Sequence, residues 1–187
     1  YDHRFGRNRE ATVDNLINCG FTYGFEVEKI EAKEIESVNV SSTKIRNAIT
    51  TGDIHKANKY LNRPFGITGK VVTGNGIGRK LDFPTANISI SEDSKLLPKD
   101  GVYFVKSSIK SRYFFGMMNI GFRPTVKGKV RTTEVHYFNF NENLYDRNIK
   151  IEVLDLIRNE KKFNSLEDLE KQLITDKKLC KDLIQKL

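Results

Sequence analysis

The stretch that decides the fold is VVTGNGIGRKLDFPTANISI, residues 71–90, in which a glycine-rich turn joins two segments with the composition of β-strands. These two candidate strands span 66–73 and 84–90, and four more follow at 101–109, 112–120, 131–140 and 148–157. Six short strands separated by Gly, Pro, Asn or Asp favour a small closed antiparallel barrel over a parallel α/β sheet. We therefore predict an α+β domain over 64–187, built on a six-stranded antiparallel, Greek-key-like β-barrel with a helical C-terminal tail.

Helical patterns flank this barrel. Ser165 can cap a tail helix whose apolar side begins at Leu166, Leu169 and Leu173. Upstream, Ser41 or Ser42 predicts the start of one helix. Asp53 predicts the start of a second, which closes at Pro64.

The first third of the chain has a mixed α and β pattern. Residues 7–19 predict a helix that stops at Gly20, and the alternation in 21–30 predicts a strand. We place a domain boundary at residues 62–65.

The 187 residues carry a formal charge of +8, and 38% of them are hydrophobic. This is too apolar for a disordered chain, and no apolar run approaches the roughly 20 residues of a membrane span. The polar N-terminus has no signal-peptide pattern, and two isolated cysteines, Cys19 and Cys180, make a zinc site or a disulfide a poor interpretation. We expect a cytoplasmic protein without a membrane partner.

The excess positive charge lies in the middle of the sequence. Residues 64–131 hold twelve basic and four acidic side chains, whereas the flanking segments are close to neutral. Such a concentration attracts an anion, which could be nucleic acid, a membrane surface or a phosphorylated small molecule.

The glycine-rich turn is the first candidate for an anion site. Gly74, Gly76 and Gly78 allow a close backbone approach, and Arg79 and Lys80 follow directly. The spacing matches neither a Walker A loop nor a dinucleotide fingerprint. The alternative is an ordinary hairpin turn.

The next motif offers oxygen ligands. Thr85 and Asn87 stand two residues apart and share a face if the segment is extended. Their neutral oxygens suit Mg²⁺ that shares its shell with phosphates, although such a pair is also common on an exposed strand.

The segment 133–138 provides a candidate base. Strand alternation places Glu134 and His136 on one face, and Val135 and Tyr137 on the other. Glu134 could form a cross-strand ion pair or accept a proton from an attacking hydroxyl.

These motifs, in this order, resemble the riboflavin kinase module of the bacterial bifunctional riboflavin kinase/FAD synthetases. The order is the glycine loop, Phe-Pro-Thr-Ala-Asn at 83–87, Leu-Pro-x-x-Gly-Val-Tyr at 97–103, Asn-Ile-Gly-x-Arg-Pro-Thr at 119–125, Glu-Val-His at 134–136, Leu-Tyr at 144–145 and Arg-x-Glu-x-x-Phe at 158–163. The resemblance covers 64–187 and implies transfer of the ATP γ-phosphate to riboflavin to give FMN.

The resemblance also implies roles for single residues. The glycine loop with Arg79 and Lys80 would bind ATP, Thr85 and Asn87 would hold Mg²⁺, and Glu134 would be the catalytic base. The residues expected near the flavin are Arg123, Tyr145, Phe163 and Leu166. One departure is Asp82, which stands where the family usually has Gly.

Residues 1–63 are similar to the C-terminal part of the family's FMN adenylyltransferase domain. The matching positions are Asp2, Phe5 and Arg9 near the flavin and nucleotide site, and Ser41, Ser42, Thr43 and Arg46 at the ATP phosphates. The 187 residues contain no HxGH-type nucleotide motif. We therefore expect a truncated adenylyltransferase domain that has lost FAD synthesis, whereas the intact family polypeptide makes both FMN and FAD.

A competing hypothesis is a basic β-barrel that binds single-stranded nucleic acid, with Phe and Tyr as stacking platforms. Its affinity would fall steeply with salt, whereas a riboflavin kinase would quench riboflavin fluorescence and need Mg²⁺. The motif order favours the kinase, so we expect riboflavin and ATP rather than nucleic acid as partners, and the sequence predicts no oligomeric state.

Overall fold

The computed structural model describes residues 4–29, 34–35, 38–74, 76, 78–90, 96–125 and 128–187. The chain divides into two compact units, Tyr1–Ser41 and Ser42–Leu187. In the first unit lie the 3₁₀ helix η1 (Arg7–Arg9), helix α1 (Val13–Tyr23) and the two-residue strands β1 (Glu34–Ile35) and β2 (Val38–Asn39).

Helix α1 corrects three predictions, the first being its start, which lies at Val13 instead of residue 7. It continues through Gly20 to Tyr23 and ends at Gly24, whose φ of 74° is left-handed and whose N–H donates to Gly20 O at 2.9 Å. The predicted strand over 21–30 is also wrong, because 21–23 are helical and 25–29 have no regular structure. Gly20 does not end the helix. Instead it lets the Phe25 carbonyl oxygen come close to the helix, since a Cβ at this position would lie 2.5 Å from Phe25 O.

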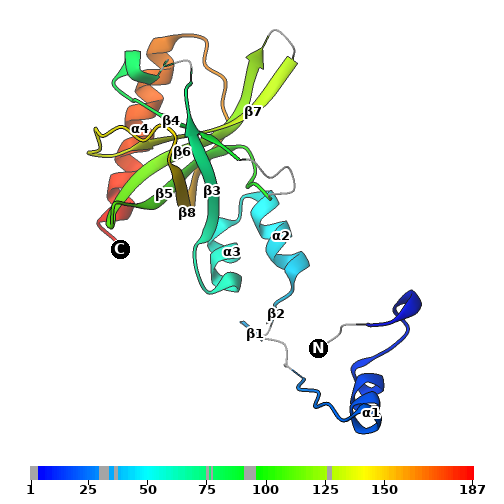
Figure 1. Ribbon diagram of the computed structural model, residues 1–187. Helices are drawn as coiled ribbons and strands as arrows, with labels where there is room; N and C mark the ends of the chain where they lie inside the picture. Colours follow the sequence, from blue (N-terminus) through cyan, green and yellow to red (C-terminus); the bar gives the residue numbers. More distant parts are fainter. Residues whose placement is uncertain are drawn as a thin grey trace. The chain divides into compact units, whose positions relative to one another are not determined.

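The second unit is built on a closed barrel of six antiparallel strands (Figure 1). The strands are β3 (Phe65–Val72), β4 (Ala86–Ser89), β5 (Gly101–Ile109), β6 (Arg112–Thr125), β7 (Gly128–Tyr137) and β8 (Asn148–Asn159), in the spatial order β3-β4-β7-β6-β5-β8. Strands β5 to β7 form consecutive antiparallel pairs and β8 returns beside β5, which is a Greek key. The predicted barrel is confirmed.

The β6–β7 hairpin is longer than the sequence pattern predicts. Pairing continues to Thr125 and Gly128, so the two strands extend beyond the others (Figure 1). Strand β7 correspondingly begins earlier than predicted and ends at Tyr137.

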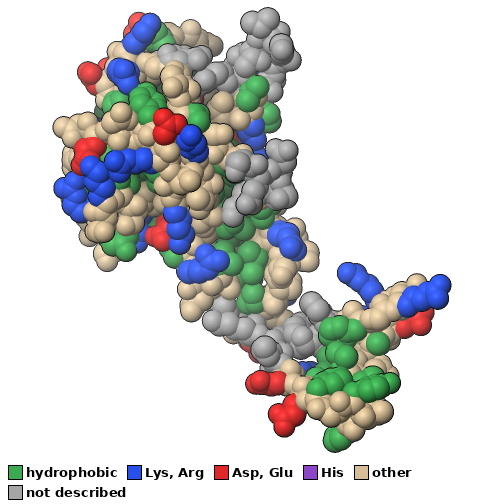
Figure 2. All heavy atoms as spheres, in the orientation of Figure 1, with side chains coloured by type: hydrophobic (Ala, Val, Ile, Leu, Met, Phe, Trp, Pro, Cys, Tyr) green, Lys and Arg blue, Asp and Glu red, His purple; other side chains and the backbone are tan. Residues whose placement is uncertain are grey.

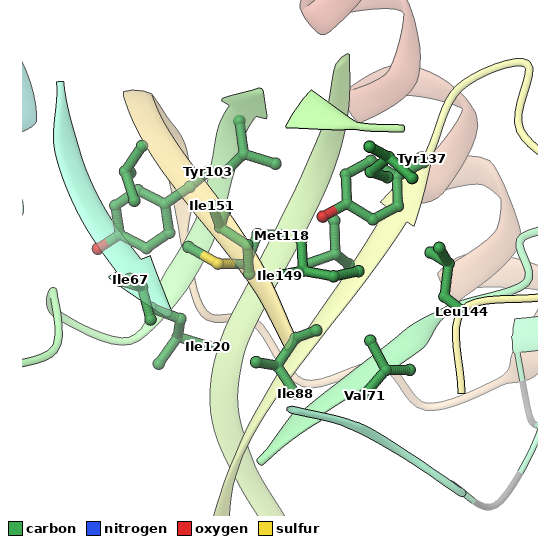
Figure 3. Packing of buried hydrophobic residues seen from close by; sticks show 14 of the residues in the cluster. Ile67, Val71, Ile88, Tyr103, Met118, Ile120, Tyr137, Leu144, Ile149 and Ile151 are labelled. Atoms are coloured by element: carbon green, nitrogen blue, oxygen red, sulfur yellow. The ribbon is translucent and has the colours of Figure 1, made fainter. Parts of the chain in front are cut away.

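The barrel interior is filled by side chains at alternate strand positions. Figure 3 labels Ile67, Val71, Ile88, Tyr103, Met118, Ile120, Tyr137, Ile149 and Ile151 from the strands, together with Leu144 from the connection between β7 and β8. The buried hydroxyl groups of Tyr137 and Ser107 are 2.8 Å apart and share a hydrogen bond. Burial raises the pKa of Tyr137 to about 12, so this ring stays neutral within the core.

Two short helices pack on the barrel. Helix α2 spans Ser42–Thr51 and α3 spans Ile54–Leu61, where Asp53 Oδ1 accepts from Lys56 N at 3.2 Å as a cap. Asn58 of α3 joins this pair to the barrel, because it donates to Val153 O at 2.9 Å and accepts from Phe65 N at 2.7 Å. Both helices thus fold with the barrel, and the functional boundary at 62–65 stays a prediction.

Helix α4 (Leu166–Ile184) lies along one side of the barrel (Figure 1). Its predicted cap is present, since Ser165 Oγ accepts from Asp168 N at 3.1 Å. Cys180 of α4 is fully buried in a second apolar cluster with Val102, Phe104 and Met117 of the barrel. Among the described residues, no helix combines the length and apolarity that crossing a membrane requires.

Candidate active site

Two cavities adjoin the barrel, and Thr85 lines both of them. Cavity 1 has a volume of about 460 Å³ and is lined by Val71, Arg79, Pro84, Thr85, Ala86, Val135, Tyr137, Phe140, Asn141, Glu142, Asn143, Leu144 and Tyr145. Cavity 2 has a volume of about 280 Å³ and is lined by Gly76, Gly78, Leu81, Phe83, Thr85, Val102, Met117, Asn119, Glu134, His136, Arg158, Glu160, Lys161, Phe163, Leu169 and Leu173.

The pairing of β4 with β7 brings the candidate base next to the candidate metal ligands. Asn87 stands opposite Glu134 in the ladder, and the Thr85 hydroxyl donates to Glu134 Oε2 at 3.0 Å. The predicted alternation along β7 is confirmed, because Glu134 and His136 line cavity 2 while Val135 and Tyr137 belong to the core.

The glycine loop lies against this pair of strands. A Cβ at Gly74 would lie only 2.0 Å from Asn87 Nδ2, so glycine is required for the Asn87 amide to occupy its place. Gly76 and Gly78 line cavity 2, whereas Arg79 lines cavity 1. The short 3₁₀ helix η2 (Gly78–Leu81) contains Arg79 and the exposed Lys80.

The turn after η2 explains the departure at Asp82. Its φ is 56°, in the left-handed region where glycine is the least strained residue. Directly after it, Phe83 N donates to Gly78 O at 2.8 Å and closes the loop. Asp82 thus adopts the backbone conformation that a glycine would adopt there.

His136 is buried at the edge of cavity 2. Its Nδ1 lies 2.9 Å from Pro84 O, so Nδ1 carries the proton and donates, and the neutral ring has a bare Nε2. Nε2 is buried and has no hydrogen-bond partner among the described residues. Burial lowers the pKa of His136 and outweighs the Pro84 hydrogen bond, which raises it, while the charge of Lys177 lowers it further.

The apolar side chains of cavity 2 come from four parts of the fold, the first being the end of the glycine loop with Leu81 and Phe83. Val102 and Met117 come from β5 and β6, Phe163 from the segment after β8, and Leu169 and Leu173 from α4. Such a slot suits a flat aromatic ring system.

The residues predicted near the flavin do not share one cavity. Phe163 lines cavity 2, whereas Tyr145 lines cavity 1 with Arg79. Leu166 is 55% exposed and lies outside both linings. The side chain of Arg123 lies outside the described residues.

Sequence reasoning missed Leu169 and Leu173 as cavity residues, although it placed both on the apolar side of the tail helix. It also missed Phe140, Asn141 and Asn143 of cavity 1. In this part of the chain only Leu144 and Tyr145 belonged to a motif. A signal for Leu169 and Leu173 was available, since residues four apart on a helix share a face.

The positions expected in the adenylyltransferase remnant are divided between the two units. Asp2 lies outside the described residues. Phe5, whose N donates to Ala11 O at 2.7 Å, and the exposed Arg9 belong to the first unit, which Ser41 closes. Ser42, Thr43 and Arg46 belong to the second unit, at the start of α2.

Comparisons with known proteins agree with this arrangement of motifs and strands. The model of the flavokinase family, described as riboflavin kinase, matches residues 61–184. The bifunctional riboflavin kinase/FMN adenylyltransferase of Buchnera aphidicola subsp. Schizaphis graminum is 41% identical over 184 residues, and that of Escherichia coli K12 is 36% identical over 176 residues. These matches cover 96% and 94% of this chain but only 58% and 56% of the relatives.

A solved structure named as a macrolide-efflux protein from Streptococcus pneumoniae aligns with a TM-score of 0.84 and 34% identity. The alignment covers 97% of this chain and 58% of that chain. Together with the family model, which spans more than half of the sequence, these matches show that the chain belongs to the riboflavin kinase family.

Proposed function

We propose that this chain transfers the γ-phosphate of ATP to the ribityl 5′-hydroxyl of riboflavin, giving FMN and ADP. The observation that carries the proposal is the position of Thr85, which lines both cavities and donates to Glu134. A phosphate donor in one cavity and a hydroxyl acceptor in the other would meet beside a single carboxylate. Phosphoryl transfer depends mainly on such positioning and on charge stabilisation.

Each cavity fits one substrate by its chemistry. Cavity 2, with its apolar walls and Glu134 at one side, suits the flavin ring and its polar ribityl chain. Cavity 1 offers the Arg79 cation, the aromatic rings of Phe140 and Tyr145, and the amides of Asn141 and Asn143, which suit a nucleotide. On this assignment Tyr145 would contact the nucleotide instead of the flavin.

The donor groups beside the glycine loop fit Mg²⁺. Among the described residues, no cluster of three or more His, Cys, Asp or Glu side chains could hold a metal ion. The Thr85 hydroxyl and the Asn87 amide are instead neutral oxygen donors two residues apart, Asn87 in β4 and Thr85 directly before it, next to Glu134. Mg²⁺ held there would neutralise charge on the triphosphate, with phosphate oxygens completing its shell.

Glu134 would act as the base of the reaction. Its carboxylate would take the proton of the 5′-hydroxyl as the ribityl oxygen forms a bond to the γ-phosphorus. The bond from that phosphorus to the bridging oxygen breaks, and ADP leaves with the electron pair. The hydrogen bond from Thr85 fixes the orientation of the carboxylate before the substrates arrive.

The direct test is to incubate the chain with riboflavin, ATP and Mg²⁺ and to separate the flavins by chromatography. We expect FMN to accumulate, and to be absent when either ATP or Mg²⁺ is omitted. A complete reaction that leaves riboflavin unchanged would contradict the proposal.

A further inference from the structure

The most deeply buried ion pair among the described residues joins α4 to the end of β8. Asp176 of α4 is fully buried, its Oδ2 accepts from Arg158 Nε at 2.9 Å, and Arg158 Nη2 forms an ion pair with the same oxygen at 2.9 Å. Gln172, one turn earlier, donates to Asp176 Oδ1 at 2.9 Å. The carboxylate thus has two hydrogen-bond donors and an ion-paired guanidinium from two elements, which is the condition for burying a charge.

The Arg158 partner belongs to the wall of cavity 2. Its side chain is 19% exposed, and its guanidinium carbon lies 5.7 Å from the centre of the Phe163 ring. Both Arg158 and Phe163 line cavity 2. A guanidinium at this distance is within the range of a cation–π contact with the ring, and its ion pair with Asp176 restrains its position.

The same pair fixes the rotation of α4. Leu169, Leu173, Asp176 and Cys180 recur at intervals of three or four residues, so they share one face of the helix. Because Asp176 can satisfy its buried charge only by facing Arg158, the helix is held at the rotation that turns Leu169 and Leu173 into cavity 2. Three segments of the wall are therefore coupled through one pair.

We infer that Asp176 and Arg158 are a positioning pair for riboflavin binding, which set the shape of the apolar wall that receives the flavin ring. The inference rests on the proposed function and assigns a role to Asp176, which lines neither cavity. The pair acts through Phe163, Leu169 and Leu173 and takes no part in the transfer of the phosphoryl group.

The test is a double substitution that removes the pair without leaving a buried charge. In Arg158→Met with Asp176→Leu, apolar side chains of similar size replace the ion pair, a change that is often neutral for folding. We expect riboflavin binding, measured by fluorescence quenching without ATP, to weaken about tenfold, the size of one charge-assisted contact. The KM for ATP should change by less than about twofold, because contacts in separate cavities act independently.

A second variant, Arg158→Lys, keeps a positive charge beside Asp176 but loses the planar fork. We expect it to weaken riboflavin binding by a similar factor. If both variants bind riboflavin as tightly as the wild type, the inference is wrong. It is also wrong if each variant lowers the unfolding midpoint and turnover but leaves the Kd for riboflavin unchanged, because that pattern indicates a structural role only.

A matched control separates this effect from the general loss of an ion pair. Lys106 and Glu152 form a partly buried pair with an N–O distance of 3.3 Å on the barrel wall and line neither cavity. Lys106→Met with Glu152→Leu should leave the Kd for riboflavin unchanged. If the wild type itself neither quenches riboflavin fluorescence nor makes FMN, the proposed function fails first and the inference falls with it.

Discussion

At the scale of single residues, the hydrogen bond from Thr85 to Glu134 holds a carboxylate of cavity 2 beside a residue that lines both cavities. A carboxylate acts as a base only if it faces the proton that it must remove. Glu134 stands in the middle of a paired strand, opposite Asn87, so its backbone is fixed by the barrel and its side chain by Thr85.

Glu134→Gln tests this role. The amide keeps the size of the side chain but cannot accept the proton, so we expect turnover to fall by about 10²–10⁴-fold. Riboflavin and ATP should still bind with affinities close to those of the wild type, as measured by fluorescence titration and KM. Glu152→Gln, on the barrel wall, is the control, and near-normal turnover in the Glu134 variant would exclude it as the base.

Asp82 provides a second prediction, which concerns the backbone. At a φ of 56°, a β-branched side chain is strained far more than Asp, whereas Gly is not strained. We expect Asp82→Val to lower the free energy of unfolding by about 1–2 kcal/mol, and Asp82→Gly to change it by less than about 0.5 kcal/mol. Urea unfolding of the three proteins measures both values, and equal stability of the Val variant would contradict the strained turn.

His136 should make stability depend on pH. Burial, opposed by the Pro84 hydrogen bond and assisted by Lys177, lowers its pKa below the ordinary value of 6.5, so the unfolded chain takes up the proton first as the pH falls. The contribution is complete above pH 6.5 and is lost as the pH falls from there toward the lowered pKa. Urea unfolding between about pH 7.5 and 5.5 should show this decline, and His136→Gln should flatten it.

At the scale of elements, the strands and helix caps were predictable because each depends on local pattern. Alternation located the six strands, and Ser165 and Asp53 marked the helix starts that the structure contains. The pattern failed at Gly20, which sequence alone equates with a helix end. There the close approach of Phe25 O, a contact made by the folded backbone, explains the glycine.

The candidate site was predictable only where local sequence motifs mark its residues. Thr85, Asn87 and Glu134 are brought together by one strand pairing, and their motifs signalled each of them. The distribution of Tyr145 and Phe163 between two cavities depends on how loops and α4 pack on the barrel. No local pattern encodes that packing. Leu166 was therefore predicted near the flavin, whereas Leu169 and Leu173 line cavity 2.

The loop that forms one wall of cavity 1 is held by the β5–β6 hairpin. Glu142 accepts from Arg112 Nη2 at 2.9 Å and from Lys110 Nζ, and the Lys110 hydrogen bond is the main cause that lowers the pKa of Glu142. Glu142 also lines cavity 1, so we expect Glu142→Gln to raise the KM for ATP about two- to fivefold, the range of an exposed ion pair. The Kd for riboflavin should not change. An unchanged KM for ATP would show that ATP binding does not depend on the ion pairs of Glu142.

At the scale of the whole molecule, ion pairs offset part of the positive charge that the sequence concentrates in 64–131. Cations of this segment pair with acidic residues, most of them from later in the chain: Lys70 with Asp146, Lys106 with Glu152, Lys110 and Arg112 with Glu142, and Arg131 with Asp100. On the face shown in Figure 2, Lys and Arg side chains are interspersed with Asp and Glu. This differs from the continuous basic groove of a barrel that tracks single-stranded nucleic acid.

The last prediction concerns which flavin the chain produces. The relatives are named for both riboflavin kinase and FMN adenylyltransferase activity, but the 187 residues contain no HxGH-type motif. We expect incubation with FMN, ATP and Mg²⁺ to yield no FAD, while riboflavin under the same conditions yields FMN. Formation of FAD in a chromatographic assay would show that adenylation does not depend on that motif.

The filled interior of the barrel has a consequence for how the sequence can change over time. Met118 faces the closed core, where another apolar residue of similar volume is tolerated, because packing constrains size more than chemistry. Its neighbour on the strand, Asn119, faces cavity 2, where polar groups decide which ligand fits. Adjacent positions of one strand are thus subject to unrelated constraints, and a substitution in the core can raise stability without altering the surface of the proposed site.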